Sequence, residues 1–153
     1  IDGFVEAMPG GFETLNVTIT KAIKDAAAVI AEQFSASGIN LYNKGLTAHD
    51  AKVVAEILKS NTRLTEIILG GNKEIGDEGA KALAEALKVN ATLKQLSLYG
   101  CGIGDDGAAA LAEALRSNTS LTELDLVHNG IGEQGKQLLR DAVAGRQGFW
   151  LSL

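Results

Sequence analysis

Hydrophobic residues recur along this chain with two alternating periods. Short segments alternate apolar and polar residues, as in 67–69, 96–98 and 124–126, which is the period of a strand with one buried face. Each is followed by a segment in which a glycine and two large apolar residues step by four, as in 79–87 and 107–115, which is the period of a helix with one apolar stripe. The pattern predicts short strands alternating with helices, and we expect the glycine to let the start of each helix pack close to the strand.

The same order of positions recurs at a nearly constant step of about 28 residues, from Leu64 to Leu93 and again from Leu93 to Leu121. The recurring positions carry similar residue types in three repeats: Leu64, Ile67, Leu69, Asn72, Ile75, Gly79, Leu83 and Leu87, then Leu93, Leu96, Leu98, Cys101, Ile103, Gly107, Leu111 and Leu115, then Leu121, Leu124, Leu126, Asn129, Ile131, Gly135, Leu139 and Val143. A weaker copy precedes these, with Asp50 in the place of the glycine and with apolar residues at Ile39, Leu41, Leu46, Val54 and Leu58. Such regularity indicates an array of structural repeats.

One repeat cannot fold alone, because burying one strand face and one helix face does not offset the entropy lost on ordering the chain. The repeats must therefore stack, which places their strands in one parallel inner sheet and their helices on the outer side. The predicted fold is α/β, a right-handed α/β solenoid. We expect about four repeats in residues 36–153, ending in a terminal strand at 150–153. Residues 1–35 match the repeat poorly, and a helical pattern at 20–34 predicts an N-terminal capping helix or a degenerate repeat.

The repeat pattern, written LxxLxLxxNxIxxxGxxxLxxxL, resembles the leucine-rich repeats of ribonuclease-inhibitor type over about residues 36–153. The fragments IGDEGAKALAEAL and NTSLTELDL are most similar to the repeats of NOD-like receptors and their relatives. This resemblance implies a segment of a horseshoe-shaped scaffold that binds another protein through the concave face of its sheet.

Composition narrows the choice of partner and of compartment. The formal net charge is −5 and no run of Lys or Arg stands out, which argues against nucleic acid or an anionic membrane as the main partner. No apolar run approaches the roughly 20 residues that span a bilayer. The single cysteine, Cys101, excludes an internal disulfide, and without a signal-peptide pattern we expect a cytoplasmic protein. The chain opens on Ile1 rather than Met, and we interpret it as a fragment of a longer protein.

No residue pattern predicts catalysis. Asn72, Cys101 and Asn129 share one repeat position, at the corner between strand and loop, where we expect their side chains to bond backbone groups. The only histidines, His49 and His128, lie three repeats apart, and no spacing of ligands suggests a metal site. Gly-rich loops such as GCGIG lack the lysine of a phosphate-binding loop. We therefore expect no enzyme, no cofactor and no metal.

The inner face of the sheet carries the candidate binding surface. If Ile67 and its counterparts point to the core, the residues beside them point away from it. These outward positions differ between repeats, and they place two tyrosines next to apolar and acidic residues, a composition typical of contact surfaces. The acidic edge favours a basic or neutral partner segment. The predicted protein-binding residues are Tyr42, Glu66, Ile68, Gln95, Ser97, Tyr99, Glu123, Asp125, Val127 and His128.

Other functions remain open. The repeats are compatible with a regulatory or sensor segment of a NOD-like receptor. They are also compatible with a GTPase-activating protein of the Ran type, although no catalytic residue can be matched to this chain. The strand at 150–153 allows self-association by pairing with another chain. Asn90 and Asn118 each begin an N-x-[ST] sequence, which we interpret as part of the turn between helix and strand rather than as a glycosylation site.

Overall fold

Strands and helices alternate along the whole of the described chain. A computed structural model describes residues 37–153. Its elements, in order, are β1 Gly38–Asn40, α3 Ala48–Ser60, β2 Glu66–Ile68, α4 Gly76–Leu87, β3 Gln95–Ser97, α5 Asp105–Ser117, β4 Glu123–Asp125, α6 Glu133–Val143 and β5 Trp150–Ser152. The predicted alternation and the terminal strand are confirmed. The cap expected in residues 1–35, with its helix at 20–34, lies outside the described residues.

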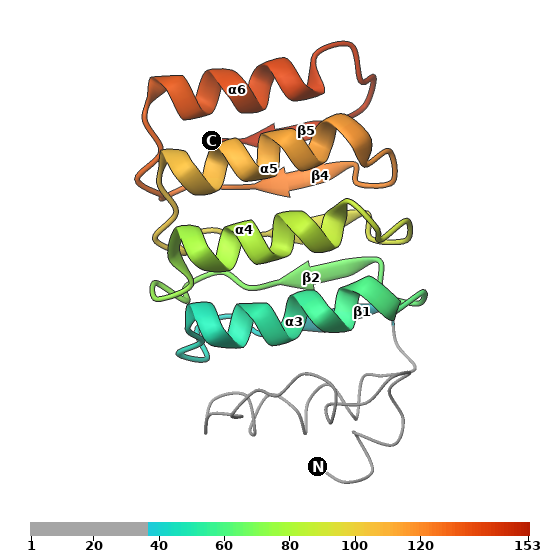
Figure 1. The fold of residues 1–153 in the computed structure, drawn as a ribbon, viewed down its shortest axis with the longest axis vertical. Coiled ribbons are helices and arrows are strands. Elements are labelled where there is room, and N and C mark those ends of the chain that lie inside the picture. The colour runs from blue at the N-terminus through green and yellow to red at the C-terminus, as the bar shows by residue number, and fades with distance from the viewer. Residues whose placement is uncertain (1–36) are drawn as a thin grey trace, which may run out of the picture.

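The strands form one parallel sheet in chain order, β1-β2-β3-β4-β5. Each pair has the register that the repeat predicts, which places one row across the sheet: Ile39, Ile67, Leu96, Leu124 and Leu151. Figure 1 shows helices α3 to α6 stacked in a single layer on one side of this sheet. The fold is an α/β solenoid, as the sequence predicts.

The core lies between the sheet and the helix layer. The central residue of each strand from β1 to β4 is buried, and its two neighbours are more exposed. Of the large apolar residues predicted for the core by the four repeats, all but one are buried. The exception is Val143, which is only partly buried because α6 is the last described helix and no further described helix packs on its outer side.

The glycine of each repeat makes room for the preceding helix rather than for the strand. A Cβ atom at Gly107 would lie 2.7 Å from Oδ1 of Asp77 and 3.0 Å from Cβ of Ala80, both in α4. It would also lie 2.8 Å from Cγ2 of Ile103. These separations are shorter than an unstrained contact between non-bonded atoms. The expectation that the strand is the close neighbour of the glycine was therefore wrong, since the helices themselves approach each other there.

Acidic side chains of one repeat cap the helix of the next. Oδ1 of Asp77 accepts hydrogen bonds from the backbone N–H groups of Gly104 and Gly107, at 2.7 Å and 2.9 Å, at the start of α5. Asp105 accepts one from the N–H of Gly132, at 2.7 Å, at the start of α6. Because these donors would otherwise lack a partner within their own helix, each repeat stabilises the one that follows.

The first described helix is capped by a neighbour in sequence instead. The N–H of Thr47 donates to the carboxylate of Asp50 at 2.8 Å, and the two residues complete a capping box. Asp50 is buried at the position that the later repeats give to glycine.

Polar side chains bridge adjacent repeats where the strands end. We call Asn72, Cys101 and Asn129 the strand-end ladder. Oδ1 of Asn129 accepts hydrogen bonds from the N–H groups of Cys101 and Ile103, at 3.0 Å and 2.9 Å, and Asn72 bonds the repeat before it in the same way. The Cys101 thiol donates to the carbonyl oxygen of Leu69 at 3.2 Å. The predicted structural role of this position is confirmed.

A second polar row lies where the helices end, in the turns to which sequence analysis assigned Asn90 and Asn118. We call Asn61, Asn90, Asn118 and Arg146 the helix-end ladder. Oδ1 of Asn118 accepts from the N–H of Leu121 at 2.8 Å, and its Nδ2 donates to the carbonyl of Asn90 at 3.1 Å. In the last repeat, the Arg146 guanidinium donates to the carbonyls of Asn118 and Leu121. Asn90 and Asn118 are buried, so their N-x-[ST] sequences serve the turn and offer no accessible nitrogen to a glycan.

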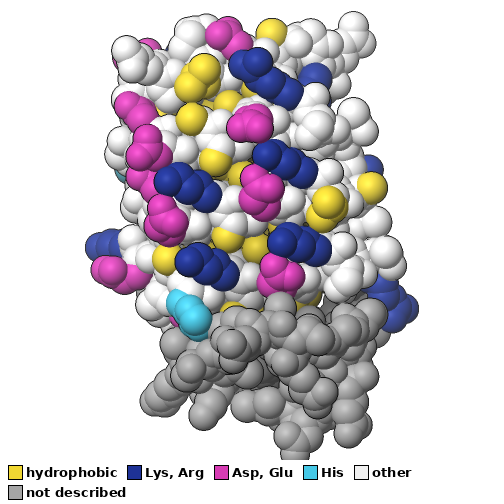
Figure 2. All heavy atoms as spheres, viewed as in Figure 1, with side chains coloured by type: hydrophobic (Ala, Val, Ile, Leu, Met, Phe, Trp, Pro, Cys, Tyr) yellow, Lys and Arg dark blue, Asp and Glu magenta, His cyan; other side chains and the backbone are white. Residues whose placement is uncertain are grey.

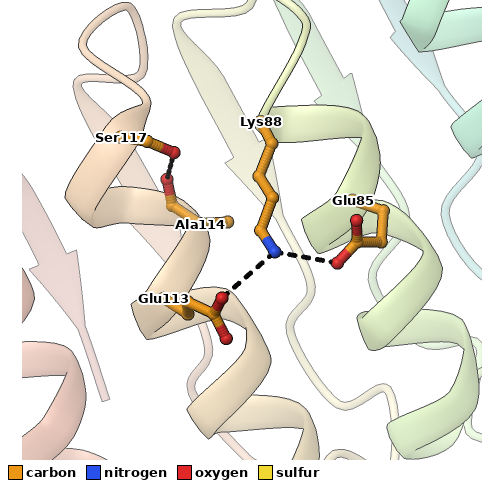
Figure 3. A network of polar contacts seen from close by, with 5 residues as sticks. All are labelled: Glu85, Lys88, Glu113, Ala114 and Ser117. Atoms are coloured by element: carbon orange, nitrogen blue, oxygen red, sulfur yellow. Dashed lines mark hydrogen bonds and ion pairs between the residues drawn. The ribbon is translucent and has the colours of Figure 1, made fainter.

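Charged side chains of both signs cover the helix layer. Figure 2 shows Lys and Arg interspersed with Asp and Glu over the helices. Nζ of Lys88 lies 2.9 Å from Oε1 of Glu85 and 3.3 Å from Oε1 of Glu113 in α5, so it links two helices (Figure 3). Hydrogen bonds to these two carboxylates raise the pKa of Lys88. Exposed ion pairs contribute little to stability, and we interpret the helix layer as a solvated surface.

Candidate functional site: the open sheet face

One face of the sheet is left uncovered by the described helices, since all of them lie on the other side (Figure 1). The two residues that flank each buried strand centre point to this uncovered side, which we call the open sheet face. Its two strand rows are Gly38, Glu66, Gln95, Glu123 and Trp150, and Asn40, Ile68, Ser97, Asp125 and Ser152.

Backbone hydrogen bonds continue past the strand ends and extend the open sheet face. The N–H of Asn43 donates to the carbonyl of Gly70 at 2.8 Å, and equivalent bonds join the next two pairs of repeats. The next two rows are therefore Tyr42, Gly70, Tyr99 and Val127, and Asn43, Gly71, Gly100 and His128.

Gly70 leaves room for a tyrosine on either side of it. A Cβ atom at Gly70 would lie 3.1 Å from Cδ2 of Tyr42 and 3.3 Å from Cβ of Tyr99. The ring of Tyr42 can lie where it does because the residue next to it has no side chain. Tyr42 is 51% exposed, so about half of its surface is accessible to a partner. A hollow of about 470 Å³ between these residues, which we call the tyrosine hollow, is lined by Tyr42, Asn43, Gly71, Lys73, Tyr99, Gly100, Gly102 and His128.

His128 has an uncommon backbone conformation at the edge of the tyrosine hollow. Its φ of 60° lies in the left-handed region, as do those of its counterparts Asn43, Gly71 and Gly100. Glycine and asparagine adopt this region readily, whereas histidine does so at a cost. The His128 ring meets the Tyr99 ring edge to face, with centroids 5.0 Å apart and planes at 84°. A residue kept in a strained conformation is a candidate for function, and this one adds an aromatic ring to the hollow.

A second hollow lies among the strands themselves. It has a volume of about 170 Å³, and we call it the carboxylate hollow; it is lined by Glu66, Ile67, Ile68, Gln95, Leu96, Ser97, Glu123 and Asp125. Nε2 of Gln95 donates to Oε2 of Glu123 at 3.0 Å, and the N–H of Val127 donates to Oδ1 of Asp125 at 3.0 Å. Two of the three carboxylates are thus held in place by neighbouring groups.

The structure gathers the residues predicted from sequence onto this one face. Nine of the ten line one of the two hollows. The tenth, Val127, lies in the same row as Tyr99. Their part in binding a partner stays a prediction.

Sequence analysis missed two residues of this face. Trp150 is 67% exposed and lies beside Glu123 in the first strand row. Aligning WLSL at the end of the chain with ELDL of the preceding repeat would have placed Trp150 there. Lys73, which lines the tyrosine hollow, lies between Asn72 and Ile75, where this repeat is one residue longer than the next and the alignment is ambiguous.

Cys101 is fully buried, and burial raises the pKa of its thiol to about 11, so it stays protonated at neutral pH. Within 37–153, no group of three or more His, Cys, Asp or Glu residues could hold a metal ion. No helix in the described part of the chain is long and apolar enough to cross a membrane.

The fold and its period define the class of protein. A parallel sheet backed by one layer of helices, with a repeat step of about 28 residues, is an arrangement that leucine-rich repeats form. Residues 60–84, 89–112 and 117–137 match a family model described as Leucine Rich repeat. The chain therefore contains leucine-rich repeats.

Solved structures with this fold include the following two. Leiomodin-1 actin-binding site 2 has a TM-score of 0.72 at 21% identity, over 88% of this chain and 80% of that chain. The C-terminal domain of tropomodulin from Caenorhabditis elegans has a TM-score of 0.70 at 14% identity, over 88% of this chain and 83% of that chain. At these identities the likeness shows the fold alone. No curated protein compared with the chain matches it in sequence.

Proposed function

We propose that the chain is a non-catalytic protein-interaction module that binds a partner through its open sheet face. The observation that carries this proposal is the pair of neighbouring hollows on a face that the described helices leave uncovered. Leucine-rich repeats support it, because stacked repeats build an extended surface for binding.

The side chains of the open sheet face also support it. Tyr42 and Tyr99 offer large, stiff surfaces with a polar tip, the kind of side chain that anchors interfaces. Ile68 and Val127 add apolar surface beside them, and Asp125 adds charge. A partner that covers these residues would bury apolar area at its centre and keep polar groups at its rim, which is the usual anatomy of an interface.

Affinity capture read by mass spectrometry tests this proposal. The chain is used as bait beside a variant that combines Tyr99→Ala with Asp125→Asn, and beside a helix-layer control that combines Lys88→Ala with Glu113→Ala. A true partner is captured by the chain and by the control and is depleted on the open-face variant. Each open-face substitution should weaken its binding by more than about 1 kcal/mol. A partner retained by the open-face variant and lost with the control would place the site on the helices instead.

Actin is a specific candidate for the partner. Its support is the fold shared with leiomodin-1 actin-binding site 2, at a TM-score of 0.72. Co-sedimentation with filamentous actin and titration of fluorescent monomeric actin test it directly. Binding that Tyr99→Ala weakens would support actin, and no binding at about 100 μM of either form would remove it.

The subtype of the leucine-rich repeats and the kind of parent protein are part of the same proposal. The ribonuclease-inhibitor type is supported by the repeat step of about 28 residues and by Asn or Cys in the strand-end ladder. A place in a NOD-like receptor is tested by the sequence of the parent protein, and Ran-type activation by GTP hydrolysis assays with small GTPases. Cytoplasmic location and self-association through β5 stay predictions.

A further inference from the structure

The charges in the two strand rows of the open sheet face have one sign. In the rows that cross the sheet from β1 to β5, the charged side chains are Glu66, Glu123 and Asp125, and no Lys or Arg occupies these rows. One basic side chain, that of Lys73, lines the tyrosine hollow from the loop beyond the strands. Carboxylates in rows that contain no Lys or Arg favour a cationic partner there and disfavour an acidic one.

Two of the three carboxylates are held in place before any partner arrives. Glu123 accepts a hydrogen bond from Gln95, and Asp125 accepts one from the N–H of Val127. Glu66 lies across β3 from them, on the far side of Gln95 in the same row. A guanidinium or ammonium group placed between these three carboxylates would meet two acceptors, on Glu123 and Asp125, whose positions are already fixed, which lowers the entropy lost on binding.

The two hollows follow each other along the strand direction. Asp125 is two residues before the row of Tyr42 and Tyr99, and Glu123 is four residues before it. At about 3.3 Å per extended residue, the carboxylates and the tyrosines are about 7 to 13 Å apart. An extended segment of a partner spans that distance with side chains two to four residues apart.

Resting on the proposed function, we propose that the partner presents an extended basic segment, in which an Arg or Lys enters the carboxylate hollow and an apolar or aromatic side chain two to four residues away enters the tyrosine hollow. The apolar side chain packs on the rings of Tyr42 and Tyr99, with the His128 ring closing the far side. Lys73 keeps a second cation out of the tyrosine hollow. The carboxylates in one hollow and Lys73 in the other therefore determine which hollow takes the basic side chain of the segment and which takes the apolar one.

Selection from a phage-displayed library of random 12-residue peptides tests this inference. The library is selected on the chain, and the enriched peptides are synthesised and titrated against three variants by fluorescence anisotropy. One variant combines Glu123→Gln with Asp125→Asn, which removes charge while keeping hydrogen-bonding oxygens. The second is Gly70→Ala, whose added Cβ would lie 3.1 Å from Cδ2 of Tyr42 and would fill the space beside that ring without straining a left-handed backbone. The third, Lys88→Ala in the helix layer, is the control. Thermal unfolding of each variant verifies that it folds.

The inference expects peptides that pair an Arg or Lys with an apolar or aromatic residue two to four positions away. Their affinity should fall at least tenfold on the charge variant and at least threefold on Gly70→Ala, and should be unchanged on Lys88→Ala. Peptides without a basic residue that still lose affinity on Gly70→Ala would overturn the basic segment but leave the proposed function standing. If no enriched peptide is sensitive to either open-face variant, both proposals fail.

Discussion

The carboxylate of Asp77 in α4 accepts a hydrogen bond at 2.9 Å from the backbone N–H of Gly107, a residue of the next helix. The same oxygen lies where a side chain at Gly107 would have to go, since a Cβ atom there would be 2.7 Å away. The carboxylate of Asp77 can therefore reach this N–H only because residue 107 has no side chain. This contact, together with the strand-end and helix-end ladders, links each repeat to its neighbour by hydrogen bonds.

Removing the Asp77 side chain should destabilise the stack. We expect Asp77→Ala to lower the free energy of unfolding by about 1–2 kcal/mol, because two N–H groups at the start of α5 lose their acceptor. Urea denaturation followed by circular dichroism measures it. Asp106→Ala is the matched control, since Asp106 is an exposed acidic residue in the first turn of the same helix. Equal losses for the two variants would show that the cap from the neighbouring repeat has no special role.

Substitution in the helix-end ladder should lower the free energy of unfolding more than Asp77→Ala does. Asn118 is buried and fully hydrogen-bonded, so Asn118→Ala leaves backbone groups of two repeats without partners. We expect a loss of at least about 2 kcal/mol in the free energy of unfolding. The exposed neighbour Thr119→Ala should change it by less than about 0.5 kcal/mol. If Asn118→Ala leaves the free energy of unfolding unchanged, the hydrogen bonds of the helix-end ladder do not stabilise the fold.

His128 should show a conflict between stability and binding. His128→Asn keeps a residue that tolerates a φ of 60°, whereas His128→Val places a β-branched residue there. We expect the Val variant to be less stable than the Asn variant by about 1–2 kcal/mol. Both should bind a partner of the open sheet face more weakly, because each removes the ring that contacts Tyr99. Equal stabilities in thermal melts would contradict the left-handed conformation.

Cys101 should be unreactive until the chain unfolds. Burial raises the pKa of its thiol to about 11, so at pH 8 a disulfide reagent such as DTNB should react only after denaturant is added. A thiol that titrates within seconds in the native protein would contradict this burial.

The same pKa shift predicts a dependence of stability on pH. Below pH 9.0 the thiol is protonated in both the folded and the unfolded chain, and its contribution is complete. Between pH 9.0 and about 11 the unfolded chain loses its proton first, so the free energy of unfolding falls as pH rises. Cys101→Ala should lack this part of the alkaline slope. If urea denaturation shows the same dependence of unfolding free energy on pH for both proteins, the alkaline loss of stability does not come from the Cys101 thiol.

The architecture could be predicted from the sequence because the apolar residues that determine it recur periodically. Leu96 and Leu124 recur at the step that sets the register of the sheet, so position in the repeat predicts burial. Asn118 was harder, because an asparagine in a polar turn reads as an exposed residue until the neighbouring carbonyls are known. The role of Asp77 was hidden for a related reason: an acidic residue in the first turn of a helix is expected to favour its own helix, and the close approach of the next one appears only in three dimensions.

The sequence predicted which residues belong to the candidate site but not the shape of the surface that they form. Strand alternation places Glu66, Ile68 and Asp125 on the open sheet face without any structure. The division into two hollows could not be predicted, because it depends on Gly70 giving the Tyr42 ring its place and on the left-handed turn at His128. Both are consequences of neighbouring strands rather than of local sequence.

Methyl NMR offers a direct view of which face a partner covers. Ile68 and Val127 carry methyl groups on the open sheet face, whereas Val89 and Leu138 carry exposed methyl groups away from it, in the turn after α4 and in α6. When a captured partner or a selected peptide is added to the labelled chain, the signals of Ile68 and Val127 should shift or broaden and those of Val89 and Leu138 should stay in place. Shifts confined to Val89 and Leu138 would show that the partner binds the helices and that the open sheet face is not the site.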